Sequence, residues 1–317
     1  MSLSEFNLID DYFKPHGPLA AGVVLGIGDD AAVVQVPPHH HLVLTMDTLV
    51  AGVHFPHDTP PHAIGHKALA VNLSDLAAMA AQPAWITLAL TLPSSDPAWL
   101  SAFSQGLLEL AQRHAVTLIG GDTTQGPLTI TLQAHGLIPE GQAITRHQAQ
   151  VGDDIYVTGT IGDAGLALAA LQQRATLPET DLTTLLTRLN YPTPRLAEGL
   201  ALRPLAHSMI DISDGLAADL SHILQQSQVG ARLYLQDIPL SYPLRRWLHQ
   251  GGSWQLPLTA GDDYELCFTA PRHARGDIAA LPFQMTRIGT IEITPGLRCT
   301  QADGSELPLS ALGYQHF

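Results

Sequence analysis

The stretch LGIGDDAAVV, residues 25–34, decides whether this sequence can form a dinucleotide-binding fold. Within it, GIGDDA matches the G-x-G-x-x-A spacing of the dinucleotide-binding fingerprint. That motif needs a long helix after the turn, because the helix N-terminus holds the pyrophosphate. Here AAVVQV favours a strand that Pro37 and Pro38 end, and Asp29 and Asp30 would repel a phosphate. We therefore reject the dinucleotide fold and expect a turn beside a strand that carries its own carboxylates.

The rest of the chain alternates between strand and helix patterns, which is typical of an α/β or α+β fold. Residues 42–50, LVLTMDTLV, alternate with a period of two, so Thr45 and Asp47 share one face and Met46 points to the other. Residues 61–81 and 96–115 favour helices, and residues 84–93, 116–124 and 128–138 favour strands. After a polar stretch at 140–152, strand–turn–helix patterns return over 154–171 and 207–227, with strands expected within 231–240 and 258–270. We expect two domains, residues 1–140 and 141–317.

Charge limits the possible ligands. The formal net charge is −14, from 15 Lys and Arg against 29 Asp and Glu, and the only lysines are Lys14 and Lys67. Such a chain cannot coat a nucleic-acid backbone, which needs many cationic contacts, so phosphates would require metal ions as the main positive charge. There is no apolar run of about 18 residues, and the N-terminus is acidic where a targeting peptide is basic. Cys267 and Cys299 form no disulfide or zinc motif, and we expect a cytoplasmic protein without a membrane partner.

Aspartates recur on or beside apolar elements, where an unpaired carboxylate is costly to bury. They are Asp30, Asp47, Asp75, Asp122, Asp211 and Asp214. Two carboxylates about 4 Å apart repel by roughly 4 kcal/mol at an effective dielectric near 20, and divalent cations such as Mg²⁺ relieve that repulsion. Each acid also has a simpler interpretation: Asp214 as a helix N-cap, Asp30 and Asp122 as turn formers, and Asp75 as a solvent-facing residue.

Six motifs occur in the order and approximate spacing of the thiamine-monophosphate kinase family, within the wider group of aminoimidazole ribonucleotide synthetase. They are GIGDDAAV, TMDTLVAGVHF, KALAVNLSDLAAMAAQPAW, LIGGDTT, DISDGL and GDDYELCF. The resemblance extends over essentially the whole chain, to the closing GYQHF. It implies an N-terminal mixed-sheet domain that dimerises and binds metal and ATP, and a C-terminal α/β domain that completes the nucleotide and substrate site. The implied reaction is phosphorylation of thiamine monophosphate to thiamine diphosphate with ATP and several Mg²⁺ ions, the last step of thiamine diphosphate biosynthesis.

The same resemblance implies roles for individual residues. The implied magnesium ligands are Asp30, Thr45, Met46, Asp47, Asp75, Asp122, Asp211 and Asp214. The implied ATP contacts are Gly121, Asp122, Arg146 and Ser213, and the implied substrate contacts are His54, Asp262 and Tyr314. Two positions depart from the family pattern. Met46 stands in the middle of a strand that commonly reads Ser/Thr-Thr-Asp in the family, so a metal contact there would come from its backbone oxygen. Asp262 is one methylene shorter than the usual Glu.

Both substrates would be anions, so positioning and charge neutralisation are the main requirements of the reaction. The acceptor is a phosphate oxygen that is already deprotonated at neutral pH, since the second phosphate pKa is about 6. We therefore expect direct in-line transfer with no catalytic base, with His54 positioning the substrate and Tyr314 offering a cation–π face to the thiazolium ring.

Other functions predict other sequence features. Selenophosphate synthetase-like members use a reactive Cys or selenocysteine near the N-terminus, and the hydrogenase-maturation relatives use a C-terminal Cys; this sequence has neither. Aminoimidazole ribonucleotide synthetase shares part of the acidic layout, while VAGVHF and GDDYELCF favour the thiamine enzyme. A magnesium–nucleotide-binding regulator without turnover and a metal-dependent phosphatase are the alternatives from other classes, and an assay for thiamine diphosphate distinguishes them.

Overall fold

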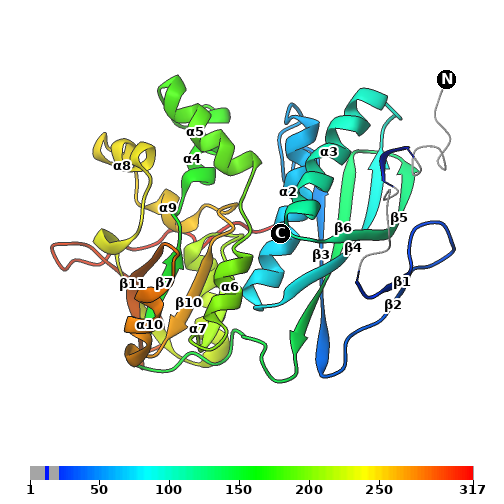
Figure 1. Cartoon of the computed structure of the whole chain (residues 1–317). Coiled ribbons are helices and arrows are strands. Elements are labelled where there is room, and N and C mark those ends of the chain that lie inside the picture. The colour runs from blue at the N-terminus through cyan, green and yellow to red at the C-terminus, as the bar shows by residue number, and fades with distance from the viewer. Residues whose placement is uncertain (1–10, 14–20, 317) are drawn as a thin grey trace. The chain divides into compact units, whose positions relative to one another are not determined.

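The computed structural model describes residues 11–13 and 21–316, so Phe317 of the closing GYQHF lies outside the described residues. The chain divides into two compact units, Met1–Leu76 with Ala81–Gln142, and Ala77–Ala80 with Ala143–Phe317 (Figure 1). The break after Gln142 falls inside the polar stretch 140–152. We describe each unit by itself.

The first unit is built on a four-stranded mixed sheet with the order β3-β6-β4-β5. Its strands are β3 (His40–Val50), β4 (Gln82–Leu92), β5 (Thr117–Gln125) and β6 (Thr129–Pro139). β6 pairs antiparallel with both β3 and β4, and β4 pairs parallel with β5. β5 and β6 follow each other in the sequence but do not form a hairpin, because β4 lies between them.

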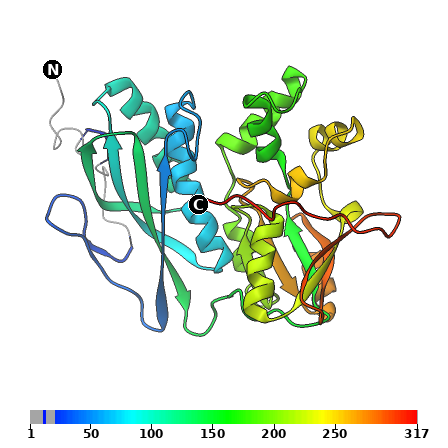
Figure 2. The same cartoon turned by 180° about the vertical axis from the view of Figure 1, so that it is seen from behind.

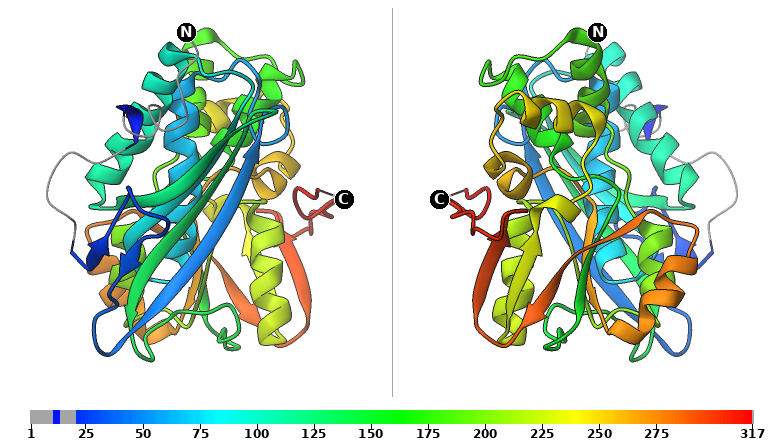
Figure 3. Two further views of the ribbon diagram at one scale, coloured as in Figure 1. Left: turned by 90° about the vertical axis from the view of Figure 1, so that its right-hand side faces the viewer. Right: turned by 90° about the vertical axis from the view of Figure 1, so that its left-hand side faces the viewer.

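Among the described residues, the helices α2 (Pro61–Ala78) and α3 (Pro97–Arg113) cover one face of this sheet. The strands lie in front of α2 in the left view of Figure 3. α3 begins as its sequence predicts: the Asp96 side chain accepts a hydrogen bond from the Ala98 N–H at 2.9 Å, and proline occupies the first turn. Ile86, Leu88 and Leu90 of β4 are buried at 4% exposure or less, so the covered face carries the core.

The other face of β3 exposes apolar side chains. Leu44 is 56% exposed and Met46 is 62% exposed. They alternate with Thr45 and Asp47, which confirms the period-two pattern of this strand. An exposed apolar row on a sheet is unusual in a monomer and is typical of an interaction surface.

The GIGDD segment forms a turn between two short antiparallel strands, β1 (Val23–Leu25) and β2 (Val33–Val34). No helix follows it, which confirms that the dinucleotide fingerprint does not apply here.

The second unit contains a six-stranded sheet with the order β12-β9-β11-β7-β10-β8, in which only β12 and β9 pair in parallel. Its strands are β7 (Asp154–Thr158), β8 (Ser208–Asp211), β9 (Gly230–Tyr234), β10 (Leu266–Ala270), β11 (Met285–Glu292) and β12 (Gly296–Thr300). Its α-helices are α4 (Asp163–Leu171), α5 (Glu179–Asn190), α6 (Leu196–Leu202), α7 (Leu216–Ser227), α8 (Tyr242–His249), α9 (Gln255–Thr259) and α10 (Arg275–Ala280). Two 3₁₀ turns, η1 (Leu235–Asp237) and η2 (Arg272–Ala274), complete it.

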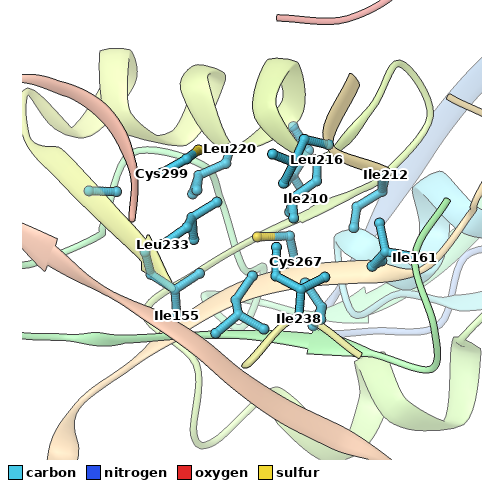
Figure 4. Close-up of a cluster of buried hydrophobic side chains, with 14 of the residues drawn as sticks. Ile155, Ile161, Ile210, Ile212, Leu216, Leu220, Leu233, Ile238, Cys267 and Cys299 are labelled. Atoms are coloured by element: carbon cyan, nitrogen blue, oxygen red, sulfur yellow. The ribbon is translucent and has the colours of Figure 1, made fainter. Parts of the chain in front are cut away.

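The core of the second unit lies between α7 and the sheet. Ile155, Ile210 and Leu233 point from the strands toward Leu216 and Leu220 of α7 (Figure 4). Both cysteines are buried in this core as free thiols, as expected from their spacing. In the part of the chain that the structure describes, no helix is long and apolar enough to cross a membrane.

Candidate functional site

The first unit places a strand hydroxyl and two aspartates together. The Thr45 hydroxyl of β3 donates a hydrogen bond to Asp75 Oδ2 of α2 at 2.5 Å. Asp47 lies on the same face of β3 as Thr45, within the strand rather than at its end. Burial and the neighbouring charge of Asp75 raise the Asp47 pKa from 3.8 to about 7. Asp75 therefore faces the sheet, and the solvent-facing interpretation of this residue is wrong.

A raised carboxyl pKa of this origin shows that the Asp47–Asp75 pair is unfavourable when both groups are ionised and no cation is present. A cation held by both oxygens would remove that penalty. The residues present therefore fit a divalent ion at this place.

Asn72 adds an oxygen on the same side of α2, one turn before Asp75. Its side chain is fully buried and its Nδ2 donates to the Ala68 carbonyl at 3.2 Å. That bond fixes the orientation of the amide, and the buried Oδ1 has no hydrogen-bond partner among the described residues. A buried amide oxygen without a donor is costly, and it is also a suitable ligand for a hard cation.

The acids of the first unit do not all gather at one point. Register pairs Asp47 with Leu132 and Leu132 with Leu88, whereas Asp122 pairs with Ala89, so Asp47 and Asp122 lie on opposite faces of the sheet. They also lie on opposite edge strands, three strand spacings or about 14 Å apart. Two aspartates so placed do not reach one ion within one chain, since each Mg–O bond is only about 2.1 Å.

In agreement with this separation, residues 11–13 and 21–316 contain no group of three or more His, Cys, Asp or Glu side chains that could hold a metal ion. A site with two carboxylates is nevertheless usual for Mg²⁺, which fills its remaining positions with water and substrate phosphates.

The remaining implied ligands of this unit lie outside the Thr45–Asp47–Asp75 group. Asp30 is exposed in the turn after β1, where its N–H is bound by the Asp29 carboxylate at 2.9 Å. Met46 points to the opposite face of β3, so its side chain is not a partner of this group.

Gly121, an implied ATP contact, lies where β5 approaches β4 closely. A Cβ at Gly121 would lie 1.9 Å from the Leu88 carbonyl oxygen, so only glycine allows this approach.

His54 is anchored to the end of β3. The backbone N–H of Val50 donates to the ring nitrogen Nδ1 of His54 at 3.0 Å. The backbone N–H of His54 donates to the Val50 carbonyl at 3.0 Å. Because Nδ1 acts as an acceptor, the neutral ring carries its proton on Nε2. The backbone of Val50 therefore holds the His54 ring in place at the end of β3.

In the second unit the DISDG and GDDYEL segments pack against each other. Leu266 of β10 pairs with Asp211 of β8, where both strands meet these segments. The Asp262 N–H donates to the Ser213 carbonyl at 2.9 Å and the Tyr264 N–H donates to the Ile212 carbonyl at 2.8 Å. A Cβ at residue 261 would lie 2.2 Å from the Ser213 oxygen, which explains the glycine at this position.

Backbone strain marks the GDDYEL turn. Asp262 has φ of 70° and Tyr264 has φ of 50°, both in the left-handed region that non-glycine residues rarely occupy. The Tyr264 hydroxyl donates to Asp262 Oδ1 at 3.0 Å and so orients that carboxylate. Strain of this kind persists where surrounding contacts enforce it, and it is common at functional sites.

The DISDG loop leads into α7 without a side-chain N-cap. The N-cap of α7 is Gly215, without a side-chain cap, so the expectation that Asp214 is the N-cap is wrong. Instead, Asp219 Oδ2 accepts hydrogen bonds from the N–H groups of Ser213, Asp214 and Gly215 at 3.0, 3.1 and 3.1 Å. Burial, followed by the charge of Asp214, raises the Asp219 pKa to about 7 despite these donors.

Tyr314 reaches the same loop from the C-terminal segment, which runs as a red trace across the second unit in Figure 2. Its N–H donates to the Asp214 carbonyl at 3.0 Å. Its ring is 49% exposed and lies edge-on to His316 at 5.0 Å. Within this unit the structure thus brings together Asp211, Ser213, Asp214, Asp262 and Tyr314.

Arg146 does not join this group. It is exposed, and its carbonyl accepts a hydrogen bond from Ser227 at the C-terminal end of α7 at 2.9 Å. Ser213 precedes the other end of the same 12-residue helix, about 18 Å away along its axis.

Sequence reasoning missed a buried charged network formed by Asp263 and Glu265 of the GDDYEL segment. Glu265 is fully buried and binds Arg195 through two hydrogen bonds, at 2.6 and 2.5 Å, with Arg188 at 2.6 Å and the Thr158 hydroxyl at 2.6 Å. Asp263, also buried, accepts the Gly162 N–H, and burial raises its pKa well above the usual value. These contacts join segments about 70 to 108 residues apart, as Glu265 to Arg195 and Leu266 to Thr158 show.

Comparison with known proteins agrees with this architecture. The N-terminal domain of AIR synthase related proteins matches residues 28–138, and the C-terminal domain of the same proteins matches residues 150–299. The thiamine-monophosphate kinase of Escherichia coli (strain K12) is 47% identical over 324 residues, covering 100% of this chain and 99% of that protein.

Two solved structures have a similar fold. The thiamine-monophosphate kinase from Stenotrophomonas maltophilia K279a superimposes with a TM-score of 0.84 at 46% identity, over 90% of this chain and 93% of that one. AaThiL, complexed with AMPPCP and TMP, gives a TM-score of 0.79 at 30% identity, over 92% of each chain. By sequence along its whole length and by the fold of both units, the chain belongs to the thiamine-monophosphate kinase family of AIR synthase related proteins.

Proposed function

We propose that this chain transfers the γ-phosphoryl group of ATP to thiamine monophosphate, with Mg²⁺, by one direct in-line step. The family and the 47% identity over the full chain support the kinase reaction. A relative that binds AMPPCP and TMP together supports a site that holds both substrates at once. The observation in this chain that carries the metal requirement is the Asp47–Asp75 pair, in which one carboxyl pKa is raised to about 7 in the absence of a cation.

Several oxygens would hold Mg²⁺ in this proposal. In the first unit they come from Asp47 and Asp75 with Thr45, and from Asp30, Asp122 and the Met46 backbone; in the second unit they come from Asp211 and Asp214. When bound, the ions would neutralise the phosphate charges and hold the two substrates in register. Because Asp122 lies across the sheet from Asp47, the two aspartates of one chain serve different ions.

The protein groups then orient the substrates. His54 contacts and positions the phosphate of thiamine monophosphate, while Asp262 and Tyr314 hold the organic part of that substrate. Gly121, Asp122, Arg146 and Ser213 contact ATP. No side chain acts as a general base, because the attacking phosphate oxygen has already lost its proton at neutral pH.

One assay separates this function from its alternatives. Purified protein with ATP, Mg²⁺ and thiamine monophosphate should form thiamine diphosphate and ADP in equal amounts. Inorganic phosphate without thiamine diphosphate would indicate a phosphatase, and nucleotide binding without any product would indicate a regulator. Use of ATP chiral at the γ-phosphorus tests the in-line step: inversion supports direct transfer, and retention would establish a phosphoenzyme.

The Mg²⁺ ligands are tested by Asp47→Asn and Asp122→Asn. Both should abolish turnover while the circular dichroism spectrum stays unchanged. Asp58→Asn, at an exposed turn, is the matched control and should retain full activity. Unaffected turnover in either of the first two variants would remove that residue from the ligand set.

We also propose that the chain acts as a homodimer in the cytoplasm. The exposed apolar row of β3, with Leu44 and Met46, supports a sheet-mediated interface. Met46→Glu should convert the dimer to a monomer in sedimentation velocity, whereas Met285→Glu in the second unit should not. A monomeric wild-type protein would contradict the interface.

A further inference from the structure

One buried carboxylate organises the loop that the proposed function uses most in the second unit. Asp219 is 3% exposed and lies in the first turns of α7, yet its Oδ2 turns back to accept three consecutive N–H groups, from Ser213 to Gly215. These donors precede the helix, and its N-cap residue, Gly215, has no side chain that could accept them. A single side chain therefore accepts the hydrogen bonds of three N–H groups in the loop that joins β8 to α7.

With its N–H groups directed to Asp219, the loop offers its carbonyl groups to other segments. The Ser213 carbonyl accepts the Asp262 N–H at 2.9 Å, and the Asp214 carbonyl accepts the Tyr314 N–H at 3.0 Å. Asp219 is thus joined through one loop to two segments that lie 43 and 95 residues further along the chain. Neither segment touches Asp219 through a hydrogen bond that the structure shows.

We propose that Asp219 is a positioning residue: it fixes the Ser213–Gly215 loop, and through the loop it sets the places of Asp262 and Tyr314. The inference rests on the proposed function for the roles of those two residues in binding thiamine monophosphate. Asp219 itself contacts no reactant. A residue that only capped α7 would change stability, whereas a residue that positions the site changes substrate binding as well.

The first measurement uses the wild-type protein and needs no activity. Amide hydrogen exchange, resolved by residue, should show Ser213, Asp214 and Gly215 protected to the same degree as the interior of α7, although they lie in a loop. Exchange of these amides at the rate of an exposed loop would overturn the proposal, whether or not any variant folds.

The second measurement compares Asp219→Ala with Asp219→Asn. The alanine has no acceptor, so exchange should accelerate at least 100-fold at residues 213–215 and at least 10-fold at Asp262 and Tyr314. The asparagine keeps a carbonyl oxygen in the same place and should restore protection to within about threefold of the wild type. Acceleration at 213–215 alone, with Asp262 and Tyr314 unchanged, would show a local cap and overturn the proposal.

Kinetics give the third measurement. Asp219→Ala should raise KM for thiamine monophosphate at least 10-fold and KM for ATP less, and Asp219→Asn should recover most of the loss. The control is Asp153→Asn, another 3% exposed carboxylate that accepts a backbone N–H, from Gln150 at 2.9 Å, near the opposite end of β8. Asp153→Asn should lower stability but leave both KM values within twofold.

The outcomes separate the two claims. If the wild type forms no thiamine diphosphate, the proposed function fails, and the exchange pattern still decides the role of Asp219. If thiamine diphosphate forms but Asp219→Ala behaves like Asp153→Asn in both exchange and KM, the positioning role fails and the function stands.

Discussion

Thr45 and Asp75, 30 residues apart in the sequence, share a hydrogen bond of 2.5 Å between β3 and α2. This bond turns the carboxylate of a helical residue toward the face of the sheet that carries Asp47. Burial, followed by the charge of Asp75, raises the Asp47 pKa, so the charges of the two acids are coupled. In the proposed function, a cation bound between this strand and this helix would relieve the repulsion between the two acids before any substrate arrives.

Mg²⁺ alone should therefore stabilise the protein. At 100 times its dissociation constant a bound ion adds about 2.7 kcal/mol, which for a chain of this size corresponds to a rise in Tm of roughly 5 °C. Asp75→Asn removes one of the two charges and should lose most of that rise, while its Tm without Mg²⁺ stays the same or increases. Differential scanning fluorimetry over a Mg²⁺ titration measures both effects; equal shifts in the variant and the wild type would contradict the site.

Tyr314 should affect one substrate more than the other. Tyr314→Ala removes the aromatic face beside the Asp214 loop, so KM for thiamine monophosphate should rise more than KM for ATP. Tyr314→Phe keeps the face and should stay near the wild type, because a cation–π contact does not need the hydroxyl. Removal of residues 313–317 should reproduce the alanine result in steady-state kinetics. Equal increases for both substrates would rule out a substrate-specific role.

Glu265 should be the most costly acid to neutralise. Glu265→Gln leaves Arg188 and Arg195 facing a neutral, buried acceptor, and breaking a buried ion pair in this way costs about 3–5 kcal/mol. The control is Glu292→Gln, because the Glu292 side chain is 30% exposed where it pairs with Arg232 and Arg298, whereas Glu265 is fully buried. Pairs that water reaches contribute about 0–1 kcal/mol. Urea unfolding followed by fluorescence gives both values, and similar losses in the two variants would contradict the role of burial.

Asp154 should give the protein part of its acid sensitivity. Burial alone would raise its pKa, but hydrogen bonds from Arg275 and the charges of Arg275 and Arg287 lower it below 3.8. A lowered folded-state pKa contributes stability above the unfolded pKa, and that stability is lost as pH falls through the folded value. The difference in Tm between the wild type and Asp154→Asn should therefore be constant from pH 5 to 7 and shrink below about pH 4. A difference that stays unchanged as the pH falls from 5 through the acid range would indicate a packing effect instead.

Local patterns in the sequence predicted much of the fold. The period of two in residues 42–50 predicted β3 and the shared face of Thr45 and Asp47, and the Asp-Pro pair at 96–97 predicted the start of α3. These features depend on neighbours within one turn or one strand, so a single sequence reveals them. The turn at Gly28 was also assigned correctly, because a strand pattern and two prolines follow it.

Long-range features could not be predicted in the same way. The position of β4 between β5 and β6 places Asp122 across the sheet from Asp47, and nothing within either strand specifies that order. The distance between Arg146 and Ser213 follows from the packing of residues 143–149 against the far end of α7. Asp219 did carry a signal: it occupies the apolar face of α7, at helical spacing from Leu216 and Ile223, where an acid requires a reason.

The buried ion pairs of Glu265 with Arg188 and Arg195 limit how these three positions can evolve. Loss of Glu265 leaves two guanidinium groups without a counter-charge, and loss of either arginine weakens the compensation of a carboxylate that no water reaches. A substitution at any one of the three positions therefore destabilises the fold until compensating substitutions occur at the other two. The three positions should therefore be inherited as a single trait, and a relative in which one of them is apolar should carry uncharged residues at all three.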